Sequence, residues 1–68
     1  MRELGEIGKY RIELFLADIR EANGITREEA IGKFCMKSGI SQRMVAEYFK
    51  ILEIGGAISK LKDGKYYV

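Results

Sequence analysis

Apolar residues recur at the spacing of an amphipathic helix in the first third of the chain. The stripe with the i, i+3, i+4, i+7 spacing consists of Ile12, Phe15, Leu16 and Ile19. It predicts a helix over residues 9–22 that buries one face in the core and ends at Asn23-Gly24. A flanking stripe consists of Tyr10, Leu14 and Ala17. Two apolar stripes on one helix indicate contacts on two sides, with the C-terminal segment or with a second subunit.

Two further helices are predicted by capping residues followed by apolar stripes. Thr26 and Glu29 have the spacing of a capping box, and the helix they start extends to about Lys37. Ser41 caps a third helix, residues 41–54, which ends before two glycines. The buried stripes are Ala30, Ile31, Phe34 and Cys35 in the second helix and Val45, Tyr48, Phe49 and Leu52 in the third. Gly32 weakens the second helix and is expected where another backbone approaches closely.

The period of the pattern changes after residue 56. The segment AISKLKDGKYYV places Asp63-Gly64 between two runs rich in Ile, Leu, Tyr and Val. A DG pair in this context predicts a β-hairpin with a two-residue type I′ turn, in which Leu61 pairs with Tyr66. A lone two-stranded hairpin is marginal in water. The hairpin is therefore expected to lean on the helices or to gain Ile25 as a third strand.

Composition excludes several kinds of chemistry. The 68 residues, sufficient for one domain, carry a net charge of only +2 and include no histidine. Cys35 is the single cysteine, so neither an internal disulfide nor a cysteine-based zinc site can form, and the usual catalytic triads are missing. We therefore expect no enzyme activity, no metal and no cofactor. No apolar run approaches the roughly 18 residues of a membrane span, and we expect a soluble, cytoplasmic protein.

The predicted order of helix, short strand, helix, tight turn, helix and hairpin resembles the winged helix-turn-helix superfamily. The residues that carry the likeness are Gly39 in the turn, the small Cys35 four positions earlier, and the apolar Phe34, Ile40, Val45 and Tyr48. Ser38 departs from the pattern, because an apolar residue often precedes the turn glycine. The resemblance implies an α+β fold, mainly α, with three helices and a β-hairpin wing over residues 9–68. Residues 1–8 are predicted as an N-terminal arm, either loose or docked through Leu4 and Ile7.

The resemblance also implies sequence-specific binding of double-stranded DNA, with helix 41–54 in the major groove and hairpin 58–68 on the backbone. The residues expected to contact bases are Ser41, Gln42, Arg43, Ala46, Glu47 and Lys50. Those expected to contact the DNA backbone are Arg27, Lys37, Lys60, Lys62 and Lys65. Arginine, glutamine and glutamate suit the edges of guanine, adenine and cytosine, respectively. A homodimer through the first helix would supply two half-sites, as expected for a transcription regulator.

These features have structural alternatives. The polar face of the third helix can be an ordinary solvated surface, and the hairpin lysines can protect a sheet edge from aggregation. The mild net charge and Glu47 favour a second function, a protein-interaction module in a transcription or replication assembly. No small-molecule substrate is expected.

Overall fold

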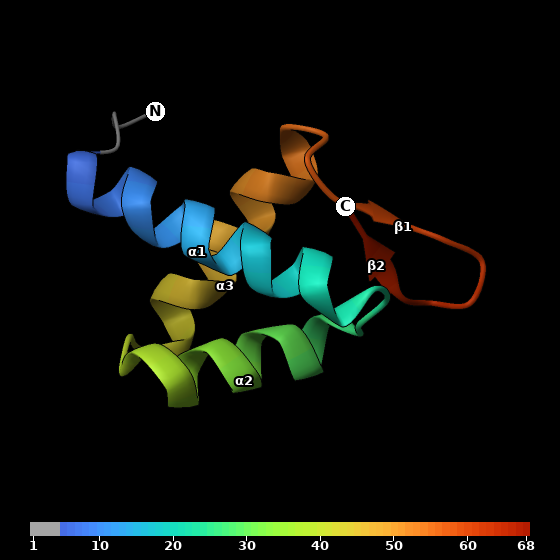
Figure 1. The fold of residues 1–68 in the computed structure, drawn as a ribbon, viewed down its shortest axis with the longest axis horizontal. Helices are drawn as coiled ribbons and strands as arrows, with labels where there is room; N and C mark the ends of the chain where they lie inside the picture. The colour runs from blue at the N-terminus through green and yellow to red at the C-terminus, as the bar shows by residue number, and fades with distance from the viewer. Residues whose placement is uncertain (1–4) are drawn as a thin grey trace.

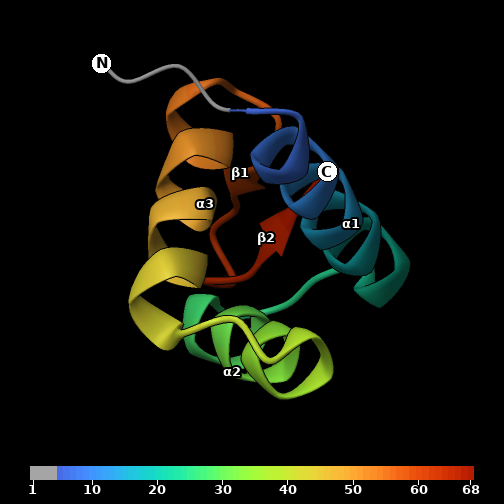
Figure 2. The same ribbon diagram turned by 90° about the vertical axis from the view of Figure 1, so that its left-hand side faces the viewer.

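The computed structural model describes residues 5–68 as three helices followed by a β-hairpin (Figure 1). The elements in chain order are α1 (Glu6–Ala22), α2 (Arg27–Ser38), α3 (Gln42–Ile54), β1 (Ser59–Lys60) and β2 (Tyr66–Tyr67). Seen end-on, the helices form a triangle with α1 and α3 on opposite sides and α2 below them (Figure 2). The prediction of a mainly helical chain that ends in an antiparallel hairpin is confirmed.

The starts of α2 and α3 follow the capping residues in the sequence. The Thr26 hydroxyl accepts a hydrogen bond of 3.3 Å from the Glu29 amide, and the Ser41 hydroxyl accepts one of 3.3 Å from the Met44 amide. Between these helices Gly39 has a φ of 75°, a left-handed conformation that glycine adopts without strain. The predicted tight turn and both predicted caps are therefore confirmed.

The start of α1 differs from the prediction. The helix begins at Glu6 instead of Lys9, because Gly8 is accommodated within the helix and the Lys9 amide already donates to the Gly5 carbonyl at 3.0 Å. Ile7 consequently lies on the helix surface, 68% exposed, and does not dock on the core. Leu4, the other expected docking residue, lies outside the described residues.

Aromatic side chains form the centre of the core. Phe15 of α1 stacks on Phe34 of α2 with ring centroids 4.7 Å apart, and Phe49 of α3 meets Tyr66 of β2 edge-on at 4.7 Å. The buried residues are Phe15, Ile19, Ile25, Ala30, Ile31, Phe34, Val45, Tyr48, Phe49, Leu52, Ile58 and Tyr66. The half-buried members of the stripes predicted to face the core are Ile12, Leu16 and Cys35. Every other member of these core-facing stripes is buried, so the inward helix faces were predicted correctly, whereas the flanking stripe of Tyr10, Leu14 and Ala17 is exposed.

The hairpin register differs from the predicted one by one residue. Lys60 pairs with Tyr66, and Ser59 pairs with Tyr67, whereas the two-residue turn predicts Leu61 opposite Tyr66. Directly paired residues share a face of an antiparallel sheet. Lys60 therefore shares the face of the buried Tyr66, and Leu61 points to solvent with 54% of its surface exposed.

Turn chemistry explains this shift. Gly64 has a φ of 81°, but Asp63 does not have a positive φ, and a type I′ turn needs positive φ at both central residues. The Asp63 carboxylate instead accepts hydrogen bonds from the Lys65 amide at 2.9 Å and the Tyr67 hydroxyl at 2.7 Å. The Gly64 amide donates to the Leu61 carbonyl at 3.0 Å, which gives a three-residue loop with left-handed glycine at its end.

Ile25 provides the expected third strand as a single bridge to the hairpin. Its amide donates to the Tyr66 carbonyl at 3.2 Å, and its carbonyl accepts from the Tyr66 amide at 2.8 Å. The segment between α1 and α2 is thus fixed to β2, and the hairpin gains the support that an isolated hairpin lacks.

Gly24 and Gly32 occupy contrasting environments. Gly24 has a φ of 110°, and a Cβ at this position would lie 2.8–2.9 Å from the ring and hydroxyl of Tyr67. At Gly32, by contrast, an added Cβ would meet no neighbouring group within 4 Å. The expected close approach of another backbone at Gly32 is therefore wrong, and the glycine only loosens an exposed position of α2.

Candidate nucleic-acid interface

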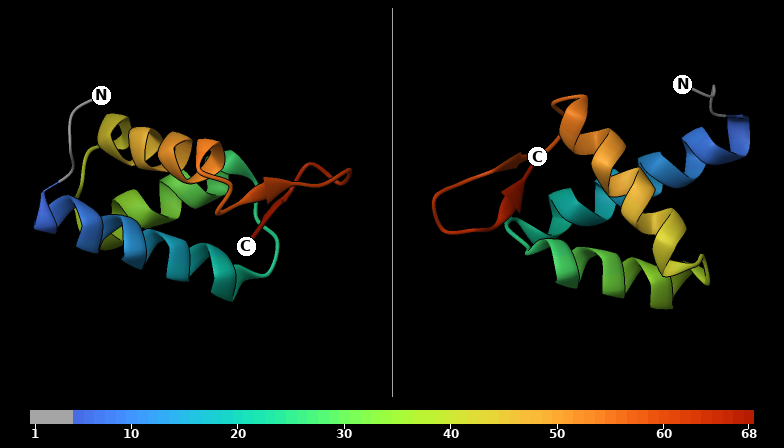
Figure 3. Two further views of the ribbon diagram at one scale, coloured as in Figure 1. Left: turned by 90° about the horizontal axis from the view of Figure 1, so that it is seen from above. Right: turned by 180° about the vertical axis from the view of Figure 1, so that it is seen from behind.

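The predicted base-contacting residues lie on the outer side of α3. The exposed members are Ser41, Gln42, Arg43, Glu47 and Lys50, and Ala46 is half-buried. Arg43, Ala46, Glu47 and Lys50 share one helix face because they are spaced three and four residues apart. The Ser41 hydroxyl caps α3, so the Ser41 side chain lies at the N-terminal end of this face. In Figure 3, α3 runs along one edge of the molecule, so its outer side is accessible to a large partner.

Arg27, at the start of α2, lies beside this face. Its guanidinium carbon is 5.8 Å from the centroid of the Phe49 ring, within the range of a cation–π contact. An open groove between α2 and α3 is lined by Arg27, Arg43, Ala46, Glu47, Phe49, Lys50 and Glu53. The structure therefore brings one predicted phosphate contact together with four of the predicted base contacts.

Glu53 lines the same groove but is missing from the residues predicted from sequence. It lies three residues after Lys50, so the helical spacing of the face could have identified it. Its carboxylate accepts a hydrogen bond of 3.0 Å from the Tyr66 hydroxyl. Burial of the Tyr66 side chain, together with this bond, raises the pKa of its phenol above 10.0. With Glu47 and Glu53 against three basic side chains, the groove has a net charge of +1.

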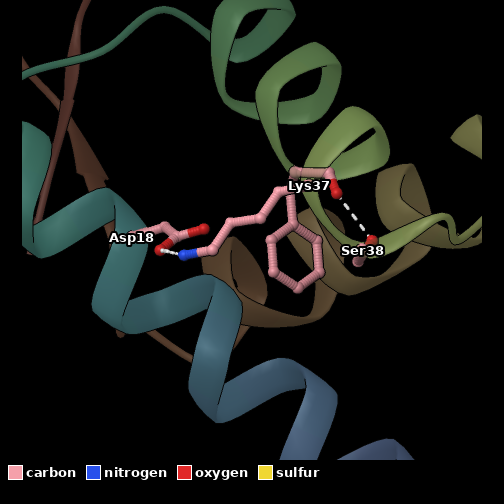
Figure 4. Close-up of polar contacts among 4 residues, drawn as sticks. Asp18, Lys37 and Ser38 are labelled. Carbon is pink, nitrogen blue, oxygen red and sulfur yellow. Dashed lines mark hydrogen bonds and ion pairs between the residues drawn. The ribbon is translucent and has the colours of Figure 1, made fainter.

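Lys37 lies apart from the other predicted phosphate contacts. Its ammonium donates to the Asp18 carboxylate of α1 at 2.8 Å, on the α1 side of α2 (Figure 4). This hydrogen bond and the charge of Asp18 raise the pKa of Lys37 above 10.5. The next residue, Ser38, donates its hydroxyl to the Phe34 carbonyl and contributes to ending α2. The contact of Lys37 therefore joins two helices, away from the α3 face.

The three hairpin lysines are exposed at one end of the molecule. Lys60 lies in β1, Lys62 begins the hairpin loop, and Lys65 lies between the loop and β2. The molecule measures 33 Å along its longest axis, with the hairpin at one end and the turn between α2 and α3 at the other (Figure 1). The lysines are thus separated along this axis from the N-terminal end of α3.

Residues 5–68 contain no group of three or more side chains suited to hold a metal ion. In the same range no helix is both long and apolar enough to cross a lipid bilayer. Comparisons with protein-family models, curated proteins and solved structures found no significant match for this chain. The site is therefore interpreted from its own geometry and charge.

Proposed function

We propose that this chain is a winged helix-turn-helix protein that binds double-stranded DNA sequence-specifically and regulates transcription. The observation that carries the proposal is the groove in which Arg27 of α2 lies with Arg43 and Lys50 of α3. A helix that enters the major groove needs base-reading side chains on its outer face and cations beside it for the flanking phosphates. The hairpin that follows α3 takes the place of the wing.

The first turn of α3 carries the groups best suited to read bases. Arg43 has the paired donors that match guanine O6 and N7, and the Gln42 amide matches adenine N6 and N7. Glu47, one turn later, is an acceptor for cytosine N4. A good bidentate pair discriminates against the wrong base by about 1–3 kcal/mol. In this role Glu47 is directed to a base edge, away from the phosphates that would repel it.

Phosphate contacts come from Arg27 beside α3 and from Lys60, Lys62 and Lys65 at the hairpin. These contacts fix the position of the protein on the duplex and carry no sequence information. Lys37 is left out of this set because its ammonium binds Asp18 on the α1 side. The protein acts by occupying its site and performs no chemistry.

A second candidate function is that of a protein-interaction module in a transcription or replication assembly. Glu47 and Glu53 in the groove favour it, because carboxylates beside a phosphate backbone are repelled. Ile54, at the end of α3, is 75% exposed and offers an apolar contact next to the same face. In this function the groove binds a peptide or domain that presents cations to the two carboxylates.

Fluorescence anisotropy with a mixed-sequence duplex, repeated across salt concentrations, separates these functions. Four phosphate contacts predict a slope of about −3.6 in the logarithm of the binding constant against the logarithm of salt concentration. Lys62→Ala is expected to reduce the slope by about one unit. Lys33→Ala, an exposed lysine of α2 on the α1 side, is the matched control and leaves it unchanged. Absence of binding at low salt with protein at about 100 μM would reject DNA as the partner, because nonspecific binding is tighter than this.

A further inference from the structure

The hairpin carries a single acidic residue, and it lies between two of the hairpin lysines. Asp63 directly follows Lys62 and precedes Lys65 by two residues, and all three residues are exposed. A carboxylate this close in sequence can compete with a DNA phosphate for a lysine ammonium, because both anions accept the same charge-assisted hydrogen bonds. The position of the Asp63 carboxylate therefore decides how many cations the hairpin offers to a phosphate backbone.

Groups of the hairpin itself hold the Asp63 carboxylate. One carboxylate oxygen accepts a hydrogen bond of 2.9 Å from the Lys65 backbone amide, and the other accepts one of 2.7 Å from the Tyr67 hydroxyl. Among residues 5–68 the only ion pair lies between α1 and α2, so Asp63 makes none with a hairpin lysine. The ammonium groups of the hairpin thus remain available to another anion.

The bond between Tyr67 and Asp63 affects both side chains. It lowers the pKa of the Asp63 carboxyl below 3.8 and raises the pKa of the Tyr67 phenol above 10.0. Near neutral pH the phenol therefore keeps the proton that it donates, and the carboxylate keeps its charge. A hydrogen bond to an ionised acceptor is stronger than one between neutral groups. This bond therefore holds Asp63 in place although the loop is exposed.

The Tyr67 side chain is fixed to the body of the protein. Its ring lies against Gly24, in the connection between α1 and α2, where an added Cβ would come within 2.8–2.9 Å of the ring and hydroxyl. The hydroxyl that reaches Asp63 thus extends from a half-buried residue. Tyr67 connects the loop to the helices at a different point from Tyr66, whose hydroxyl binds Glu53 of α3.

We propose that Tyr67 is a positioning residue for DNA binding, whose hydroxyl keeps the Asp63 carboxylate from pairing with Lys62 or Lys65 and so leaves both lysines for phosphates. Tyr67 is not among the residues predicted to contact DNA, and its role rests on the proposed function. The Tyr67 hydroxyl acts through Asp63, to which its proton is already donated. Without the hydroxyl, the released carboxylate oxygen pairs with a neighbouring ammonium and removes one phosphate contact.

Tyr67→Phe tests this role by fluorescence anisotropy with the mixed-sequence duplex at several salt concentrations. The variant keeps the ring against Gly24 and removes only the hydroxyl. It is expected to weaken binding a few fold and to make the salt dependence shallower by up to about one unit, because one ammonium is diverted from a phosphate. Tyr10→Phe, which removes the hydroxyl of an exposed tyrosine of α1, is the matched control and leaves both quantities unchanged.

Asp63→Asn distinguishes positioning from a general loss of structure. The asparagine oxygen still accepts from the Lys65 amide, but the side chain has no charge with which to pair with a lysine. The variant is expected to bind DNA at least as tightly as the wild type, and Tyr67→Phe is expected to have no further effect in the Asp63→Asn background. Equal weakening by Tyr67→Phe in both backgrounds would overturn the proposal, because the hydroxyl would then act without Asp63.

The bond itself is measured without DNA. NMR titration of the Tyr67 phenol is expected to give a lower pKa in Asp63→Asn than in the wild type, because the carboxylate that raises it is gone. Equal values would mean that the bond is not made in solution and would overturn the proposal. If the wild type binds no DNA although this pKa falls, the proposed function fails and the role of Tyr67 fails with it. If the wild type binds DNA and Tyr67→Phe matches it at every salt concentration, only the role of Tyr67 fails.

Discussion

The Tyr66 hydroxyl donates a hydrogen bond of 3.0 Å to the Glu53 carboxylate and joins β2 to the last turn of α3. The backbone of the same tyrosine pairs with Ile25, and its ring packs edge-on against Phe49. One residue thus connects the hairpin, α3 and the segment before α2. The orientation of the hairpin lysines relative to the α3 face therefore depends on Tyr66.

Tyr66→Phe tests this connection, because it keeps the ring in the core and removes only the hydroxyl. Loss of the bond to Glu53 is expected to lower the Tm by about 5 °C and to weaken DNA binding a few fold. Thermal unfolding followed by circular dichroism measures the first effect and fluorescence anisotropy the second. Tyr10→Phe, at a 62% exposed tyrosine, is the control for stability. Equal Tm values for the two variants would show that the Tyr66 hydroxyl contributes nothing to the stability of the fold.

Gly32→Ala is expected to stabilise the protein by about 1 kcal/mol, since alanine has the higher helix propensity and its Cβ meets no neighbour at this position. In a chain of this size that gain raises the Tm by roughly 4–8 °C. Chemical denaturation with a common m-value gives the free energy of unfolding. A decrease in stability would mean that Gly32 has a contact or a conformation that alanine cannot accept.

Gly24→Ala is expected to have the opposite effect. The φ of 110° is strained for any residue with a Cβ, and this Cβ would lie 2.8–2.9 Å from atoms of Tyr67. Either the backbone or the Tyr67 ring must move, and both changes disturb the bridge between Ile25 and Tyr66. We expect a loss of at least about 1 kcal/mol in the same denaturation experiment. If Gly24→Ala had the stability of the wild type, the Tyr67 ring would not lie against residue 24 in solution.

The helices were predictable from sequence because their signals are local and agree with one another. Caps at Thr26 and Ser41, the turn at Gly39 and apolar stripes at helical spacing all indicate the same boundaries. The start of α1 was less predictable, since Gly5 and Gly8 both weaken the helical signal and only one of them lies outside the helix. Local propensity alone does not decide between them.

The hairpin and the groove depend on contacts between residues that are distant in sequence or on side-chain bonds. The Asp63-Gly64 pair correctly indicates a turn, but the hydrogen bond from the Tyr67 hydroxyl to Asp63 helps to select the three-residue loop and so the register. The position of Arg27 over Phe49 follows from the packing of α2 on α3, which no local pattern specifies. For the same reason, the pairing of Lys37 with Asp18 was not predicted.

Asp63 makes the stability of the hairpin sensitive to acid. The hydrogen bond from Tyr67, followed by that from the Lys65 amide, lowers the pKa of Asp63 below 3.8. A carboxyl group whose pKa is lower in the folded state stabilises that state at pH values above the usual carboxyl pKa. This contribution to stability is lost as the pH falls through the folded-state pKa. Amide exchange or NMR shifts at the hairpin are therefore expected to show loosening below pH 3.8. Asp63→Asn is expected to remove the part of this dependence that Asp63 causes, and an unchanged profile would assign it to another group.

Two substitutions of Arg27 distinguish the effect of its charge on DNA binding from the effect of its guanidinium contact with Phe49. Arg27→Ala is expected to make the salt dependence of DNA binding shallower by about one unit, because one phosphate contact is lost. Arg27→Lys is expected to keep the slope but to lower the affinity, since lysine retains the charge without the planar guanidinium that lies over the Phe49 ring. Anisotropy titrations of both variants at several salt concentrations provide the comparison. If Arg27→Lys matches the wild type in affinity and slope, the contact with Phe49 has no part in binding; if Arg27→Ala also matches it, the groove between α2 and α3 does not face the DNA backbone.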